Sequence, residues 1–288
     1  MTYLFIFLSI IFWASSFVGI RFTIKDYSPI ELAAFRFIIA SVILIAIAYF
    51  KKIKLPAKKD LIYVLFMGSL LFLNILFLNY GAMTIKAGEI SFLLSTSTLF
   101  TVILAFIFLK ESISVKFIIG LIISLLGVAL ISLNISSGFS FNLNIAFILL
   151  ASVTYSSFFI LQKSFLKKYN SFELTSYSIW IVTLLILPLS KNLFTVIPSV
   201  SIYPTIAVIY IGIFPTVISF LCWSLVLSRI EVSKASVYLY LIPVFTIVIG
   251  YIWLDEIPTL TSLIGGIIVI AGLSLANMKN FNSIIKRA

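Results

Sequence analysis

The chain has 288 residues, of which 62% are hydrophobic and only 10% charged, and its mean hydropathy is +1.25. Soluble domains are about 45–50% apolar and about 25% charged, so the composition excludes a soluble globular protein and indicates a polytopic membrane protein. There is no histidine and a single cysteine, Cys222. These counts exclude imidazole catalysis, an intrachain disulfide and a His- or Cys-rich metal site, and we expect no cofactor.

Ten apolar stretches follow one another along the chain, each close to the length of about 20 residues that crosses the hydrocarbon core as a helix. They lie at residues 3–21, 30–49, 61–80, 87–109, 115–133, 143–163, 172–190, 203–228, 234–254 and 261–278. The first stretch has no basic segment before it and no small-residue cleavage site before Arg21, so we interpret it as a retained helix. The sequence predicts an all-α integral membrane protein with ten transmembrane helices.

The distribution of Lys and Arg between these stretches predicts the orientation of the chain. The formal charge of +11 arises from 20 Lys and Arg against 9 Asp and Glu. If the lysine-rich loop at 51–60 is cytoplasmic, fifteen of the twenty basic residues lie in cytoplasmic segments, four lie outside, and Arg36 lies within a stretch. We therefore expect an inner-membrane protein with both termini in the cytoplasm, and we attribute the positive charge to topology and not to nucleic-acid binding.

The second half of the chain repeats the first. When the residue numbers are shifted by 142, Trp13 matches Tyr155. Further along the chain the shift is 145, and it matches Phe100 with Phe245, Glu111 with Glu256, Gly120 with Gly265 and Gly127 with Gly272. We expect two repeats, at residues 1–134 and 143–279, and a short basic tail at 280–288. Because each repeat holds five helices, the second enters the membrane from the opposite side. Such inverted repeats are typical of secondary transporters that work by alternating access.

Several short motifs occur at fixed places in this pattern. They are Phe12–Phe17 (FWASSF), Ser28-Pro29 followed by Arg36, Phe108–Glu111 (FLKE), Leu241–Phe245 (LIPVF) and Trp253–Glu256 (WLDE). With them the chain resembles the EamA-type members of the drug/metabolite transporter superfamily over nearly its whole length. The resemblance implies a ten-helix inner-membrane carrier that exports small metabolites such as amino acids. Thr98, where the family usually has proline, and Glu89, where small or apolar residues are usual, depart from the family pattern.

Polar residues on two matching helices are candidates for a substrate cavity between the repeats. Ser91, Ser95 and Thr98 share one helical face, and the 145 offset relates them to Ser236, Tyr240 and Pro243. The alternative is that these Ser and Thr side chains serve close helix packing or bond their own backbone. Asn74, in the middle of the third stretch, either bonds the fourth helix or lines the substrate path.

Aromatic residues away from the membrane interfaces form a second group of candidates. Trp13 and Tyr155 occupy matching places inside their helices, and Trp223 also lies within a helix. They could line a pocket for an apolar or planar substrate, or they could simply pack the core. Pro215 and Pro243 are expected to kink their helices, as hinges or as shaping elements only.

Arg36 is a charge inside the second stretch, where an unpaired arginine costs at least about 2.5–3.5 kcal/mol. Glu89 is its nearest candidate partner by depth, and Glu31 could bond it locally. We favour a structural pair with Glu89; the functional alternative is that Arg36 binds the carboxylate of a substrate.

The function we expect is secondary transport of a small organic metabolite, an amino acid or related solute, by export through a central cavity. The alternatives are uptake or exchange of a nucleotide-like or cationic metabolite, a membrane enzyme of lipid metabolism, and a channel. Paired acids and metal clusters within the spans, a Walker-type loop and a filter-like loop are all missing from the sequence, which argues against an enzyme, a primary pump and a channel. The expected partners are the solute and the bilayer, with the chain a monomer or a weak homodimer.

Overall fold

The computed structural model describes residues 1–83, 87–132, 143–254 and 260–277, and this part of the chain is helical without a strand. Its α-helices are α1 (Thr2–Thr23), α2 (Pro29–Lys51), α3 (Leu61–Gly81), α4 (Ala87–Leu109), α5 (Val115–Ser132), α6 (Leu143–Phe165), α7 (Ser171–Ile186), α8 (Leu193–Val196), α9 (Ile202–Ile211), α10 (Ser219–Arg229), α11 (Val232–Ser236), α12 (Leu241–Leu254) and α13 (Leu260–Asn277). The short helices η1 (Lys58–Asp60), η2 (Leu187–Leu189), η3 (Ile197–Ser199), η4 (Gly212–Ile218) and η5 (Val237–Tyr240) lie between them.

Seven helical runs in the described residues are long and apolar enough to cross a membrane. They are Thr2–Thr23, Pro29–Lys51, Lys58–Gly81, Leu143–Phe165, Ser171–Leu189, Ile202–Arg229 and Val232–Trp253. Three shorter apolar helices, Leu93–Leu109, Val115–Leu130 and Leu263–Asn277, accompany them. The prediction of an all-helical, multi-pass membrane protein is confirmed, whereas ten membrane crossings stay a prediction.

The α2 and α7 helices both begin with a capping box. At α2 the Ser28 side chain accepts a hydrogen bond from the Glu31 backbone, and the Glu31 carboxylate accepts one from the Ser28 backbone. At α7 Asn170 and Glu173 make the equivalent pair of bonds, 142 residues later. Each capping box satisfies two backbone N–H groups that a helix start would otherwise leave without partners.

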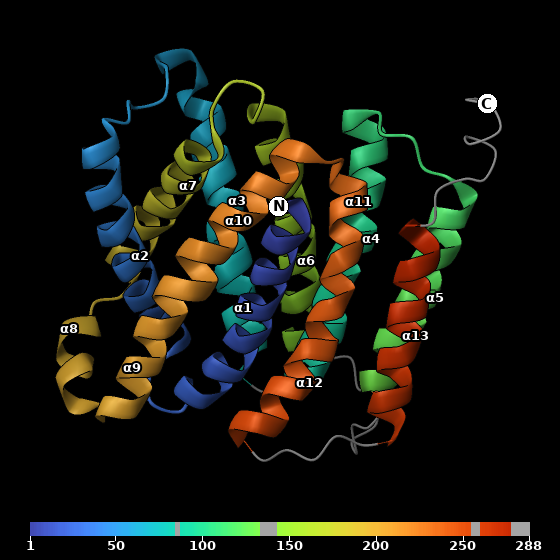
Figure 1. Cartoon of the computed structure of the whole chain (residues 1–288). Coiled ribbons are helices and arrows are strands. Elements are labelled where there is room, and N and C mark those ends of the chain that lie inside the picture. The colour runs from blue at the N-terminus through green and yellow to red at the C-terminus, as the bar shows by residue number, and fades with distance from the viewer. Residues whose placement is uncertain (84–86, 133–142, 255–259, 278–288) are drawn as a thin grey trace.

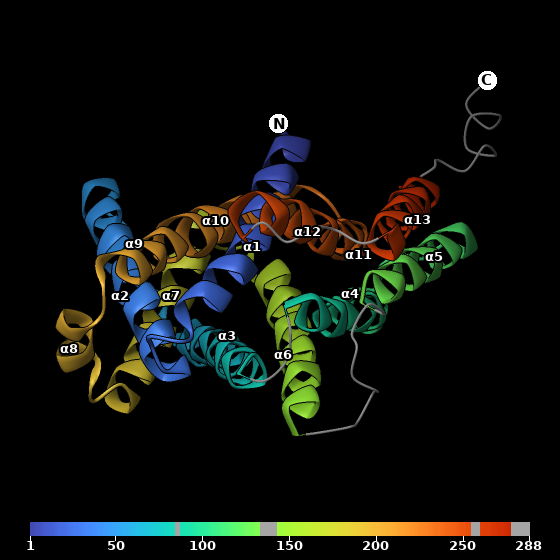
Figure 2. The same ribbon diagram turned by 90° about the horizontal axis from the view of Figure 1, so that it is seen from below.

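The α1 helix contacts α9, α10 and α12, and α6 lies between α3 and α4 (Figures 1 and 2). The α7 helix packs against α2 and α3. The main apolar core, shared by α1, α2, α3, α6, α7 and α10, lies in this part of the bundle. The α5 and α13 helices pack along each other and form one side of the molecule (Figure 2).

Glycines bring the backbones of α5 and α13 together. A Cβ atom on Gly120 would lie 2.5 Å from the Ala276 nitrogen and 2.6 Å from the Gly272 oxygen. A Cβ atom on Gly127 would lie 2.7 Å from the Gly265 oxygen. Helix pairs in membranes gain most of their stability from such close van der Waals contact, so these glycines define the pair.

Two predicted spans change their type of helix close to the prolines at which kinks were expected. The run Ile202–Arg229 passes through the π-helix η4, which contains Pro215, because proline has no N–H to donate to the usual carbonyl. Pro243 lies at the third position of α12, directly after the 3₁₀-helix η5. The short helices α8 and η3, between α7 and α9, were not predicted.

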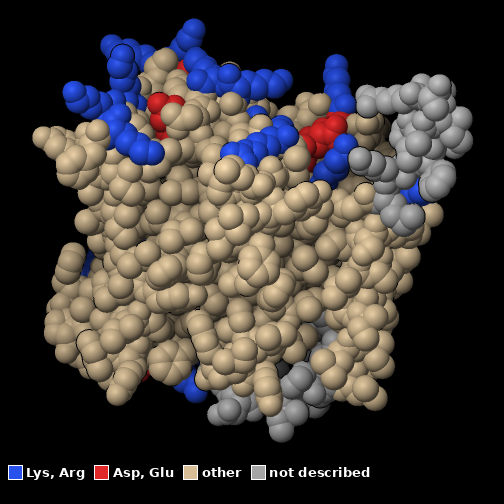
Figure 3. All heavy atoms as spheres, in the orientation of Figure 1, with Lys and Arg blue, Asp and Glu red and all other residues tan. Residues whose placement is uncertain are grey.

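On the face seen in Figure 3, Lys and Arg gather at one end, and the surface along the middle is almost free of charge. Tyr169 at this end donates a hydrogen bond to Asp60 Oδ2 at 2.6 Å, and Lys168 pairs with the same carboxylate. The bond to a carboxylate raises the pKa of the Tyr169 phenol. These contacts fix the α6–α7 connection to the start of α3.

Candidate functional site

Five aromatic side chains meet where α1, α6 and α10 approach one another, and we call them the aromatic cluster. They are Trp13, Tyr155, Phe159, Phe220 and Trp223. The Trp13 ring centroid lies 5.4 Å from that of Trp223, 5.5 Å from that of Phe220 and 6.1 Å from that of Tyr155. All five side chains are buried, and three of them were predicted as site residues.

The cluster joins the two halves of the sequence. Trp13 comes from the middle of α1, whereas the other members come from α6 and α10. Trp13 and Tyr155, which touch edge to face, are 142 residues apart. The Trp223 indole N–H is fully buried and has no hydrogen-bond partner among the described residues. Such a donor is available to a polar group that enters the cluster.

The predicted polar residues of α4 lie against α11. The Thr98 hydroxyl donates to the Ser236 carbonyl at 3.2 Å, and the Ser236 hydroxyl donates to Ser233 within its own helix. Ser95 is buried, and the side chain of Ser91 lies outside the described residues. In this structure the contact therefore closes α4 onto α11, as the packing interpretation expects.

Tyr240 and Asn74 lie apart from the aromatic cluster. Tyr240 is fully buried in a second apolar cluster with Val102, Phe117 and Val269, and its hydroxyl has no partner in the described part of the chain. The Asn74 amide donates to the Ala151 carbonyl of α6 at 3.0 Å, so it joins α3 to α6 and not to α4.

Arg36 is buried, with 4% of its surface exposed, and its Nε donates to the Thr216 hydroxyl at 3.2 Å. Glu31 does not pair with it, because the Glu31 carboxylate caps α2. The side chain of Glu89, the predicted partner, lies outside the described residues. Pro215 lies in the π-helix that carries Thr216, so two residues predicted separately belong to one local arrangement.

Sequence reasoning missed the contacts of Glu111. Its carboxylate accepts hydrogen bonds from the backbone N–H groups of Val232 at 2.8 Å and Ser233 at 2.9 Å, and from the Ser233 hydroxyl. It thereby caps the start of α11 and ties it to the end of α4. The repeated Leu-x-Glu motif was a signal of Glu111's importance, but not of its partner.

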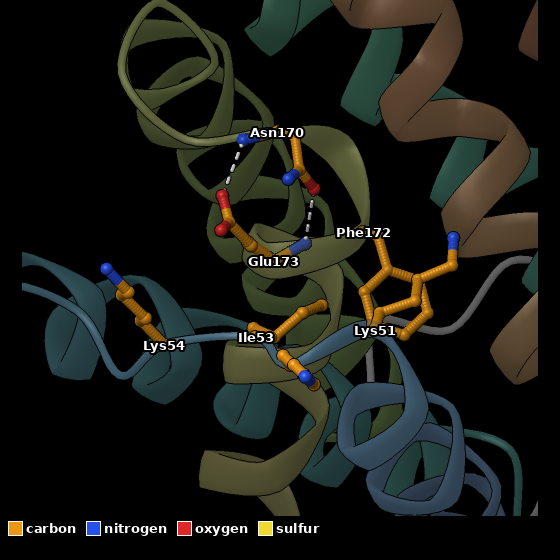
Figure 4. Close-up of a pocket in the computed structure, with 7 residues that line it drawn as sticks. Lys51, Ile53, Lys54, Asn170, Phe172 and Glu173 are labelled. Carbon is orange, nitrogen blue, oxygen red and sulfur yellow. Dashed lines mark hydrogen bonds between the residues drawn. The ribbon is translucent and has the colours of Figure 1, made fainter.

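A surface hollow of about 500 Å³ lies where α2 ends and α7 begins (Figure 4). It is lined by Lys51, Lys52, Ile53, Lys54, Asn170, Phe172 and Glu173. The Asn170–Glu173 capping box forms one wall, and the Lys51 ammonium lies 4.9 Å from the centre of the Phe172 ring. Two of its four charged side chains, Lys51 and Glu173, are thus engaged in local structure.

The described residues contain no group of three His, Cys, Asp or Glu side chains that could hold a metal ion. The interior instead offers aromatic faces, one guanidinium and unpaired hydroxyl and indole donors. Aromatic faces and unpaired donors of this kind are groups that organic ligands contact in binding sites.

Comparison with known proteins decides the family. The EamA-like transporter family profile matches residues 1–133 and again residues 142–278. The chain belongs to the EamA-like transporter family. It is therefore a transporter and not an enzyme, and its partners include a small-molecule solute and membrane lipid.

Relatives within the EamA-like family span almost the whole chain. The uncharacterized transporter YdfC of Bacillus subtilis is 35% identical over 93% of this chain and 88% of its own. An uncharacterized transporter of Archaeoglobus fulgidus is 32% identical over 94% of this chain and 97% of its own. A probable terminal-alkyne amino-acid exporter of Streptantibioticus cattleyicolor is 29% identical over 94% of this chain and 92% of its own. A solved crystal structure shares the fold with a TM-score of 0.80 over 96% of both chains, at 19% identity.

Proposed function

We propose that this EamA-like transporter exports a small organic metabolite, an amino acid or related solute, across the inner membrane by alternating access. The observation that carries the proposal is the contact between Trp13 and Tyr155, in the middle of α1 and α6. This contact between the two halves of the chain supports a substrate site there, because transporters built from repeats bind their substrates between the repeats. The relative named as a probable amino-acid exporter supports both the substrate class and the direction.

Two inverted repeats are part of the proposal, and reciprocal contacts support them. Gly120 approaches Gly272 and Gly127 approaches Gly265, and the 145 offset converts one pair into the other. A two-fold axis generates this reciprocity, because each contact is made twice.

A second reciprocal contact lies in the other part of the bundle. Ser9 donates to the Ser219 carbonyl between α1 and α10, and Asn74 donates to the Ala151 carbonyl between α3 and α6. Offsets of 142 and 145 relate these two pairs. Both contacts therefore support a two-fold relation across the whole bundle.

The proposed orientation has both termini in the cytoplasm. The charged end in Figure 3 supports it, because Lys and Arg are retained on the cytoplasmic side of inner-membrane proteins. Glu111 then ties α4 to α11 near the cytoplasmic face, and this structure represents a state in which that contact is closed.

Counterflow in proteoliposomes tests the function. The purified protein is loaded with one unlabelled amino acid at a time, and uptake of the same labelled solute is followed. We expect saturable exchange of at least one amino acid, reduced at least tenfold by Trp13→Ala and by Tyr155→Ala. Phe194→Ala, on the exposed surface of α8, is the matched control and should leave transport unchanged. Absence of exchange across the panel, or full activity in both cluster variants, would overturn the proposal.

A further inference from the structure

Arg36 is a buried charge without an ionic partner among the described residues. Its Nε donates to the Thr216 hydroxyl, and its guanidinium carbon lies 5.1 Å from the centre of the adjacent Phe37 ring. A guanidinium carries five N–H donors, and only this one is engaged by a hydrogen bond in the described part of the chain. The neighbouring acid on the same helix, Glu31, is occupied by its capping bonds.

The local backbone is arranged to hold the guanidinium in place. In the π-helix η4 the Thr216 hydroxyl donates to the Ile211 carbonyl, five residues back, at 2.9 Å, so its oxygen is left to accept from Arg36. Gly212 allows the helices to approach, since a Cβ there would lie 2.9 Å from the Arg36 carbonyl oxygen. π-Helical turns are rare and frequently lie at functional sites.

The Arg36 guanidinium is linked to the aromatic cluster through the helical run Ile202–Arg229, which carries its partner Thr216. On the helical run that carries Thr216, Phe220 lies about one turn further along and contacts Trp13 at 5.5 Å. A solute that reached both would place one end on a positive charge and the rest on aromatic faces.

A lone arginine inside the membrane is costly, and a buried charge is retained where a partner arrives to neutralise it. Carboxylates fit a guanidinium with two parallel hydrogen bonds, a geometry that neutral or cationic groups cannot form. The aromatic cluster has no carboxylate of its own that would select a cationic solute, and its surface suits an apolar body.

We infer that Arg36 and Thr216 form a carboxylate subsite and that the transported solute is a small organic acid with an apolar body, such as an apolar amino acid. The carboxylate binds the free guanidinium N–H groups, and the apolar body lies on the aromatic cluster. This inference rests on the proposed function and names the substrate class of its site.

The test compares ligands of one carbon skeleton on the purified, detergent-solubilised protein. Quenching of tryptophan fluorescence reports binding of phenylalanine, 3-phenylpropanoate, phenylalaninamide and 3-phenylpropanamide. We expect both acids to bind at least tenfold more tightly than the matching amides. Equal affinities for acids and amides would overturn the inference without any substitution in the protein.

Variants then locate the subsite. Arg36→Gln should weaken binding of the acids at least tenfold and leave the weak binding of the amides unchanged, and Thr216→Val should weaken acid binding less. Arg229→Gln is the control, since Arg229 lies over the Phe5 ring at an exposed helix end. If Arg36→Gln does not fold, Arg36→Lys is used instead. It keeps the positive charge but cannot form the two parallel hydrogen bonds of a guanidinium, so it should still bind the acids more weakly. Unchanged acid affinity in folded Arg36 variants would overturn the inference.

Transport separates this inference from the function on which it rests. If the protein exchanges the amides as fast as the acids, and this exchange is lost in Trp13→Ala, the carboxylate subsite is overturned and the transporter site is retained. Tight binding of acids without exchange of any solute would overturn the proposed function and retain the subsite.

Discussion

The hydroxyl oxygens of Ser41 on α2 and Thr183 on α7 lie 2.7 Å apart in the buried core, and the two positions are 142 residues apart. The same separation joins Trp13 to Tyr155, while Ser124 donates to the Val269 carbonyl 145 residues later. A residue can contact its own counterpart only beside the axis that relates the two. These three contacts therefore mark the line along which we propose that the two repeats meet.

The Ser41–Thr183 hydrogen bond should contribute measurably to stability. Ser41→Ala, Thr183→Val and the double variant form a cycle, and we expect a coupling free energy of about 0.6 kcal/mol, the average for hydrogen bonds between membrane helices. Unfolding by denaturant in mixed micelles measures it. Ser228→Ala, at an exposed position, should lower the free energy of unfolding by less than either core change. A coupling indistinguishable from zero would contradict the prediction.

Gly120→Ala should destabilise the protein by about 1–3 kcal/mol, because the added methyl group would lie 2.5 Å from the Ala276 backbone nitrogen. Gly266→Ala on α13 is the matched control, since its Cβ would lie no closer than 3.7 Å to Val244. Alanine also favours the helical backbone, so the control should be as stable as the parent or slightly more so. Thermal unfolding in detergent compares them, and equal losses in both variants would disprove the role of the close helix contact.

Glu111→Gln should loosen the connection between α4 and α11, because a neutral amide oxygen replaces a carboxylate that accepts from two backbone N–H groups and one hydroxyl. In a Cys222→Ser background, a cysteine introduced at the fully buried Ala235 reports the opening. We expect it to react with a thiol reagent several-fold faster in Glu111→Gln.

The control for this experiment is Glu231→Gln. Glu231 pairs with Lys234 at a partly exposed position, where an ion pair contributes little. The cysteine at Ala235 should react at the parental rate in this variant. Equal rates in the Glu111 and Glu231 variants would show that Glu111 does not hold the helices together.

The proposed orientation predicts which surface lysines face the cytoplasm. In the Cys222→Ser background, single cysteines replace the exposed residues Lys54 and Lys191. A membrane-impermeant thiol reagent added to intact cells should label Lys191→Cys at once and Lys54→Cys only after the membrane is permeabilised. The reverse pattern would invert the topology and place Glu111 on the outer side.

Hydropathy was enough to predict the helical membrane architecture, because apolar stretches of this length have few alternatives in lipid. The starts of α2 and α7 lie close to those of the predicted stretches 30–49 and 172–190, but the capping boxes of Ser28 and Asn170 were seen only in the structure. The π-helix around Pro215 could not be predicted. A proline predicts only that a hydrogen bond is lost, and the neighbouring helices decide how the backbone adapts.

Trp13, Tyr155 and Trp223 were grouped because they lie in helices away from the membrane interfaces. The structure brings the three rings together, and their role in transport stays a prediction. The partner of Arg36 was a harder problem. The position of Arg36 along its helix suggested a carboxylate as its partner. In the structure its Nε donates a hydrogen bond to the hydroxyl of Thr216, 180 residues away. Long-range pairing of this kind depends on which helix faces which, and a single sequence does not contain that information.

The glycine contacts between α5 and α13 have a consequence for biosynthesis. Gly120 and Gly127 belong to the first half of the chain, but the backbone that they approach belongs to α13, near the end of the described residues. After α5 has been synthesised, the ribosome adds about 130 further residues before α13 is made, which takes several seconds or more. A chain truncated before α13 leaves the glycine face of α5 without its partner helix, which gives quality control a means of recognising the unfinished chain.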